Sequence, residues 1–142
     1  MISNIRHSGI VVDCLDSSLK FYKDLLGFEA VKSMDESGSY IDEMLGLNFV
    51  DVKTVKMTCP DGQMIELLDF KSHKRERKKK EICDVGITHI ALSVNNLDQC
   101  YQTLKSENIE FISPPQLTPD GFAKVAFCKA PEGTYVELVQ EL

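Results

Sequence analysis

The sequence lacks any apolar run that approaches the roughly 20 residues of a membrane-spanning helix. It also lacks a basic start followed by an apolar stretch, which is the pattern of a secretory signal. Its five cysteines are odd in number and contain no Cys-x-x-Cys pair, which argues against a disulfide framework and against a cysteine zinc site. These absences predict a soluble, cytoplasmic protein with reduced thiols and no membrane partner.

What the chain does contain is an ordinary globular composition. Its 142 residues are 43% hydrophobic and 27% charged, which is enough for one domain with a real core. This composition excludes a disordered chain, a collagen-like chain and a small protein held together by disulfides.

Positive charge is scarce except in one segment. Residues 71–80 hold seven of the 16 Lys and Arg residues, so nine bases face 21 acids elsewhere. A nucleic-acid binder would spread its bases over a face and interleave aromatic side chains, and this run contains none. We therefore expect no nucleic-acid partner and interpret the run as a solvated linker. A basic arm that meets anionic groups on a substrate or a membrane surface is the alternative.

The two halves of the chain repeat each other on either side of this run. Residues 59–68 (CPDGQMIELL) match residues 130–139 (APEGTYVELV) without a gap, and residues 7–16 (HSGIVVDCLD) match residues 89–98 (HIALSVNNLD). The first half carries about eleven extra residues between its two signatures, which we place within residues 35–50. We expect modules at 1–70 and 87–142, joined by a linker at 71–86.

Each half is predicted to contain a strand, a helix and three further strands. The first helix would be capped by Asp16 and end at a left-handed Gly27, and the second would be capped by Asn95 or Asn96 and end at Asn108. Pro-acid-Gly turns join the last two strands of each half. The expected strand ranges include 5–12, 52–58 and 64–68 in the first half and 87–94, 124–129 and 135–139 in the second. The fold class is α+β, with two tandem βαβββ modules.

Two histidines and two glutamates recur at equivalent positions of the two halves. His7 and His89 lie on the first strands, whereas Glu66 and Glu137 lie among apolar residues of the last strands, where an unpaired carboxylate is costly to bury. A core histidine or an edge-strand glutamate would explain any one of them, but not the repeated pair. Two imidazoles and two carboxylates suit a divalent ion such as Zn, Ni, Co, Mn or Fe.

With residues 19–28 (LKFYKDLLGF), these patterns resemble the vicinal oxygen chelate superfamily, the glyoxalase and bleomycin-resistance fold. The resemblance implies mixed sheets that curl around a metal cavity, with His7, Glu66, His89 and Glu137 as ligands. This His, Glu, His, Glu order is similar to bacterial glyoxalase I, whereas methylmalonyl-CoA epimerases commonly have glutamine at the position of Glu66. Such glyoxalases hold glutathione with an arginine and an asparagine. This chain has Val11 at the position of the arginine and Phe70 at the position of the asparagine, so the resemblance does not extend to glutathione recognition.

The resemblance also implies a reaction and an assembly. We expect a divalent-metal-dependent lyase or isomerase that moves a proton next to the carbonyl of a small chelating substrate, with Glu137 as the base and Glu66 as its symmetry-related candidate. The alternatives are an epimerase of the methylmalonyl-CoA type, a non-haem iron extradiol dioxygenase, and a metal-free binding module of the resistance type. Modules of this family usually pair, so we expect a homodimer; the ligands could come from one chain or from two.

Strand alternation predicts which residues share a face with the ligands. This substrate pocket is mostly apolar and consists of Gly9, Val11, Met64, Leu68, Ala91, Ser93, Tyr135 and Val139. In the first-half insertion, Tyr40, Asp42 and Glu43 form either a lid or, as we favour, a surface turn with no role.

Overall fold

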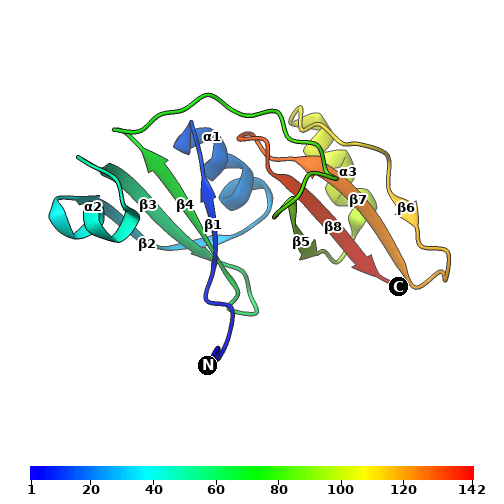
Figure 1. The fold of residues 1–142 in the computed structure, drawn as a ribbon. Helices are drawn as coiled ribbons and strands as arrows, with labels where there is room; N and C mark the ends of the chain where they lie inside the picture. Colours follow the sequence, from blue (N-terminus) through cyan, green and yellow to red (C-terminus); the bar gives the residue numbers. More distant parts are fainter. The chain divides into compact units, whose positions relative to one another are not determined.

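Each half of the duplicated sequence forms a four-stranded mixed sheet in the computed structural model, which describes residues 1–142 (Figure 1). The chain divides into two units, Met1–Arg77 and Lys78–Leu142, here called unit 1 and unit 2. The division falls inside the basic segment that the sequence predicts as a linker. None of the helices combines the length and the apolar character needed to cross a membrane.

The sheet of unit 1 has the strand order β1-β4-β3-β2. Strand β1 runs parallel to β4, and the other neighbours are antiparallel. Its strands are β1 (Ser8–Val11), β2 (Glu29–Ser37), β3 (Asp51–Thr58) and β4 (Met64–Phe70). The predicted strand at residues 5–12 is too long, so His7 immediately precedes β1.

The sheet of unit 2 repeats this topology as β5-β8-β7-β6, with β5 parallel to β8. Its strands are β5 (His89–Ser93), β6 (Gln116–Leu117), β7 (Ala123–Lys129) and β8 (Tyr135–Glu141). The predicted α+β class and the tandem modules with mixed sheets are therefore confirmed.

The first helical segment departs from the sequence prediction. Helix α1 (Leu15–Leu19) begins after Cys14, not after Asp16, and no side chain caps it. It continues as a π-helix, η1 (Lys20–Leu25), in which the adjacent aromatic residues Phe21 and Tyr22 are both fully buried. Gly27 then adopts the left-handed conformation that the sequence predicts, with φ 83°.

Helix α3 (Leu97–Ser106) of unit 2 follows the prediction more closely. The side chain of Asn96 accepts a hydrogen bond from the backbone N–H of Gln99 at 3.0 Å, which satisfies one of the free donors at the helix start. Asn108 follows the helix with φ 62°. Leu97 and Leu104 are buried, as the predicted apolar stripe requires.

The extra residues of the first half form a helix, α2 (Ser39–Leu45), and the loop after it. The surface turn that we favoured for Tyr40, Asp42 and Glu43 is wrong, because these residues lie in a helix. Asp42 accepts hydrogen bonds from the backbone N–H groups of Phe49 and Val50 at 3.0 and 2.8 Å, which hold the loop after α2. The side chains that join α2 and its loop to the sheet form one apolar cluster: Ile41, Leu47, Val50, Val52, Leu68 and Phe70.

Alternation along β4 separates the two faces of this sheet. Ile65 and Leu67 are buried on one face, whereas Glu66, Leu68 and Phe70 are half-buried on the other. Because Leu68 and Phe70 belong to the α2 cluster, α2 packs against the face that carries Glu66. The insertion therefore covers one end of the face on which the sequence predicts a metal ligand.

Candidate functional site

In unit 1, His7 and Glu66 form a direct contact. His7 Nε2 lies 3.0 Å from Glu66 Oε2, and the two side chains are 28% and 12% exposed. The parallel register of β1 and β4 explains this, because it places Gly9 opposite Glu66 and His7 is two residues before Gly9. Two of the predicted ligands, 59 positions apart in the sequence, are thus brought together by strand pairing.

In unit 2, His89 and Glu137 form the equivalent contact. His89 Nε2 lies 3.4 Å from Glu137 Oε2, with exposures of 38% and 22%. The register of β5 and β8 places Ala91 opposite Glu137, which matches the position of Gly9 opposite Glu66. The structure therefore contains the same pair twice, once in each unit, as the internal repeat predicts.

Each pair has the donors and the spacing that a divalent ion needs. Two ligands about 2.1 Å from one ion are about 3.0 Å apart at a right angle and about 3.4 Å apart at the tetrahedral angle. The observed distances of 3.0 and 3.4 Å are compatible with neighbouring ligands. Within each unit no third His, Cys, Asp or Glu side chain joins the pair.

The two histidines differ in how their second ring nitrogen is supported. His89 Nδ1 lies 2.9 Å from the hydroxyl of Thr88, which fixes the ring and leaves Nε2 as the nitrogen facing Glu137. His7 Nδ1 is buried and has no hydrogen-bond partner, and Arg6 replaces the threonine there. Both residues fit a metal through Nε2, and His89 has the outer-shell partner that such ligands generally have.

The two glutamates differ in what faces their second oxygen. Lys56 Nζ lies 3.6 Å from Glu66 Oε1, so the carboxylate of Glu66 lies between a histidine and a lysine. Phe127 occupies the equivalent position in unit 2, where it is the partner of Glu137 and packs edge-on against His89. Glu137 is thus paired with a histidine but, unlike Glu66, not with a lysine.

The sequence analysis did not identify Lys56 as a neighbour of Glu66, although the position of the hairpin turn predicts this pairing. The turn after β3 pairs Thr58 with Met64, and counting back along both strands pairs Lys56 with Glu66. In this turn Asp61 accepts hydrogen bonds from the Cys59 thiol at 2.7 Å and from the backbone N–H of Gln63 at 2.9 Å. The bond from Cys59 is the main cause that lowers the pKa of Asp61 from its usual value.

The predicted pocket residues of unit 1 share the face of Glu66. Gly9 is the partner of Glu66, and Val11 is the partner of Leu68. Val11 is 62% exposed, whereas Leu68 is half-buried in the α2 cluster. Met64, the partner of Thr58, lies two residues before Glu66 and is also half-buried.

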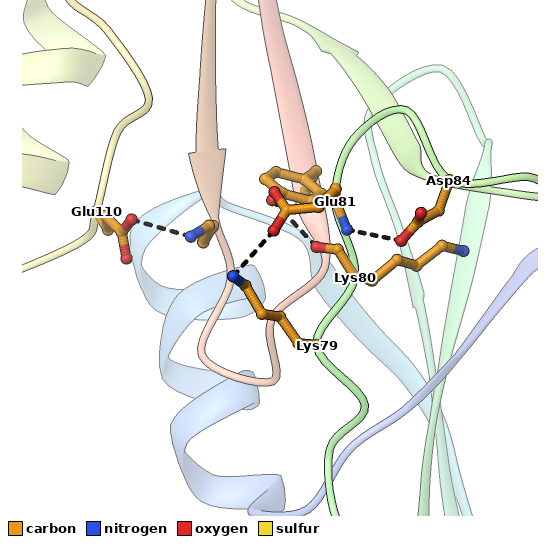
Figure 2. Close-up of polar contacts among 7 residues, drawn as sticks. Lys79, Lys80, Glu81, Asp84 and Glu110 are labelled. Atoms are coloured by element: carbon orange, nitrogen blue, oxygen red, sulfur yellow. Dashed lines mark hydrogen bonds and ion pairs between the residues drawn. The ribbon is translucent and has the colours of Figure 1, made fainter.

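In unit 2, Ala91 and Ser93 are exposed on the face of Glu137, and Tyr135 is buried. The hydroxyl of Tyr135 donates to the backbone carbonyl of Lys80 at 3.2 Å, and Lys129 lies over its ring. Figure 2 shows Lys79 paired with Glu81 in the same segment, and the backbone of Glu81 bound to Asp84. The end of the basic segment thus packs on Tyr135, which predicts a structural role for this tyrosine beside any contact with substrate.

Comparison with known proteins gives matches along almost the whole chain. The model of the glyoxalase/bleomycin resistance protein/dioxygenase superfamily matches residues 4–138. A probable lactoylglutathione lyase of Synechocystis sp. is 27% identical over 137 residues, which are 96% of this chain and 94% of that protein.

Solved structures show the same fold at lower identity. A glyoxalase family protein from Bacillus cereus has a TM-score of 0.90 at 20% identity, over 100% of this chain and 96% of that one. The trypanothione-dependent glyoxalase I of Leishmania major has a TM-score of 0.72 at 22% identity, over 99% of this chain and 88% of that one.

Proposed function

The chain belongs to the glyoxalase/bleomycin resistance protein/dioxygenase superfamily, and we propose that it is a divalent-metal-dependent lyase or isomerase of the glyoxalase type. The observation that carries this proposal is the His–Glu pair at the same strand positions of both units. Metal-free binding modules have no need for two such pairs. Since each unit supplies only two ligands, we propose that His7, Glu66, His89 and Glu137 together bind one ion.

The bound ion would stabilise the negative charge that develops on a substrate carbonyl or enediolate, which acidifies the adjacent carbon. Glu137 is the base that accepts the proton from this carbon. Glu137 pairs with His89 alone, whereas Glu66 also faces Lys56, so Glu137 is the carboxylate that is less tied to cations of the protein. Glu66 acts as a ligand only, because Lys56 already lies beside its Oε1.

The names of two relatives refer to thiol compounds, which this chain's own residues can be compared with. The relative from Synechocystis is named a lactoylglutathione lyase, and the Leishmania enzyme uses trypanothione. In this chain, Val11 is exposed and Phe70 packs in the α2 cluster, so neither can form a polar contact with a peptide thiol through its side chain. We therefore propose a small chelating substrate other than the glutathione adduct.

Metal loading tests the ligand set, and the chain offers a matched control. It contains three histidines, and His73 lies in the basic segment with its Nδ1 2.7 Å from Ser72. We expect dialysis against Zn, Ni, Co, Mn or Fe(II) to give stoichiometric binding by wild type and by His73→Ala. We expect His7→Ala and His89→Ala to lose most of the bound ion.

Elemental analysis of the dialysed proteins measures this, with circular dichroism as a check on folding. Wild-type protein that retains no ion at micromolar concentration would overturn the proposed metal dependence. Equal loss in all three histidine variants would show that the metal lies elsewhere.

A further inference from the structure

One row of side chains crosses the unit 1 sheet at the level of Glu66. The strand registers place Gly9, Glu66, Lys56 and Lys32 side by side on β1, β4, β3 and β2. Direct partners on neighbouring strands point to the same face. Two lysines therefore lie on the face that carries the proposed metal ligand.

Lys56 makes no hydrogen bond to Glu66. Their 3.6 Å separation exceeds the 2.7 to 3.2 Å of an N–H···O bond. The side chain of Lys56 is only 21% exposed, and its ammonium group, with three donors, has no protein acceptor within hydrogen-bonding distance. Lys32 is exposed and has no ion pair.

The fold itself does not require a lysine at this position. Phe127 is the partner of Glu137 in unit 2, so the same place in the same topology accepts an apolar side chain. Bases are also scarce, because only nine lie outside residues 71–80 of this acidic chain. Two of these nine, Lys32 and Lys56, lie directly opposite each other on neighbouring strands. Like charges in such a pair destabilise a sheet.

Glu66 places one carboxylate beside Lys56, and no carboxylate is paired with Lys32, so a second anion on this face would offset the repulsion that remains between the two lysines. We propose that Lys56, assisted by Lys32, binds an oxyanion group of the substrate, either a carboxylate or a phosphate, whose other end carries the two chelating oxygens. This inference rests on the proposed metal-dependent function and names its substrate class: small chelating molecules with an anionic end. At the adjacent end of this face, Leu68 and Phe70 pack into the apolar α2 cluster, which offers no charged group to an anion.

Three chelators that share one metal-binding group provide the test. Acetohydroxamate has no anionic end, succinic monohydroxamate adds a carboxylate, and phosphonoacetohydroxamate adds a phosphonate. Their dissociation constants are measured by calorimetry with zinc-loaded wild type and zinc-loaded Lys56→Met. Methionine keeps the apolar stem and removes the charge.

We expect Lys56→Met to weaken binding of at least one anionic chelator about tenfold or more, the usual effect of losing a charge-assisted hydrogen bond, and to leave acetohydroxamate unchanged. The probe that loses affinity identifies the anion as carboxylate-like or phosphate-like. Lys53→Met is the matched control, because Lys53 lies on the same strand but three residues away, on the opposite face beside Asp35.

The possible failures are distinguishable. If acetohydroxamate does not bind zinc-treated wild type, the proposed function fails and the substrate class fails with it. If acetohydroxamate binds and Lys56→Met weakens all three probes equally, Lys56 only orients Glu66, and the anion site alone is overturned. Binding of the anionic probes that is the same in wild type, Lys56→Met and Lys53→Met also overturns the anion site alone.

Discussion

Arg77 binds Asp13 through two hydrogen bonds, from Nε to Oδ2 at 2.6 Å and from Nη2 to Oδ1 at 2.8 Å. The two residues are 64 positions apart. Asp13 lies two residues after the end of β1, so this contact fastens the later part of the basic segment to the turn that follows β1. The segment is thus fixed at this point by one of its own bases, which favours the linker interpretation over a free basic arm for Arg77.

Removing this contact should change stability in a pH-dependent way. The hydrogen bond from Arg77 is the largest cause that lowers the pKa of Asp13 below its ordinary value of 3.8. A carboxylate with a lowered folded-state pKa contributes stability above the ordinary value and loses it as the pH falls through the folded-state value. We expect Arg77→Gln to lower the free energy of unfolding at pH 7 by about 1 kcal/mol or less, since the pair is exposed, and the difference to vanish at acidic pH.

Urea titrations at pH 7 and below pH 3.8 measure this difference. Arg75→Gln is the control, because Arg75 is an exposed base of the same segment without such a partner. A loss for Arg77→Gln that persists unchanged below the folded-state pKa of Asp13 would show that the arginine acts by packing and not by charge.

The proposed base can be separated from the proposed ligand by amide substitutions. Glu137→Gln keeps an oxygen that can coordinate but removes the proton acceptor, so we expect turnover to fall by about 10²- to 10⁴-fold at equal metal occupancy. Glu66→Gln should mainly weaken metal affinity. Hydroxyacetone is a suitable probe, because exchange of its proton beside the carbonyl with deuterated water is measured by NMR. The reverse order of effects would assign the base to Glu66.

Cys14 should be the most reactive thiol of the chain. The hydroxyl of Ser17 donates to its sulfur at 3.1 Å, and this bond is the main cause that lowers the pKa of the exposed Cys14 thiol. Burial raises the pKa of Cys128 to about 12. We expect iodoacetamide near neutral pH to label Cys14 faster than the exposed Cys83, and Cys128 only after unfolding.

Mass spectrometry of peptides from a labelling time course measures these rates. Ser17→Ala should slow the labelling of Cys14 without changing that of Cys83, although the backbone N–H groups that also lower the pKa of Cys14 remain. If the rate of Cys14 labelling does not change in this variant, the Ser17 hydroxyl is not the cause of the high reactivity of Cys14.

Asp42 should contribute more to stability than its neighbour Glu43. Its carboxylate accepts the backbone N–H groups of Phe49 and Val50, and Phe49 has φ 58°, an unfavourable conformation for a large side chain. We expect Asp42→Ala to lower the free energy of unfolding by about 2 kcal/mol, because two backbone donors lose a charged acceptor. Glu43→Ala, on the exposed side of the same helix, should change it little, and equal effects in urea titrations would contradict this explanation.

The parts of the fold that the sequence predicts are those that depend on turn residues, on helix-end residues and on the internal repeat. The two Pro-acid-Gly turns define hairpins, and Gly27 and Asn108 mark helix ends with positive φ because few other residues adopt it at low cost. The internal repeat gave the two modules, and with them the equivalence of His7 with His89 and of Glu66 with Glu137. That each histidine contacts its glutamate follows from parallel pairing of the first and last strands, which the structure shows.

The sequence by itself therefore determined the modules, their turns and the residue types available to a metal, because these depend on neighbours within a few positions. Only the tertiary structure decided the π-helix, where two adjacent aromatic side chains are both buried, and the helix of the insertion, whose Asp42 holds a loop seven residues away. It alone also paired Arg77 with Asp13 and set Lys56 beside Glu66 but Phe127 beside Glu137. Contacts of this kind depend on how strands and loops distant in sequence pack together, and no local pattern of residue types specifies them.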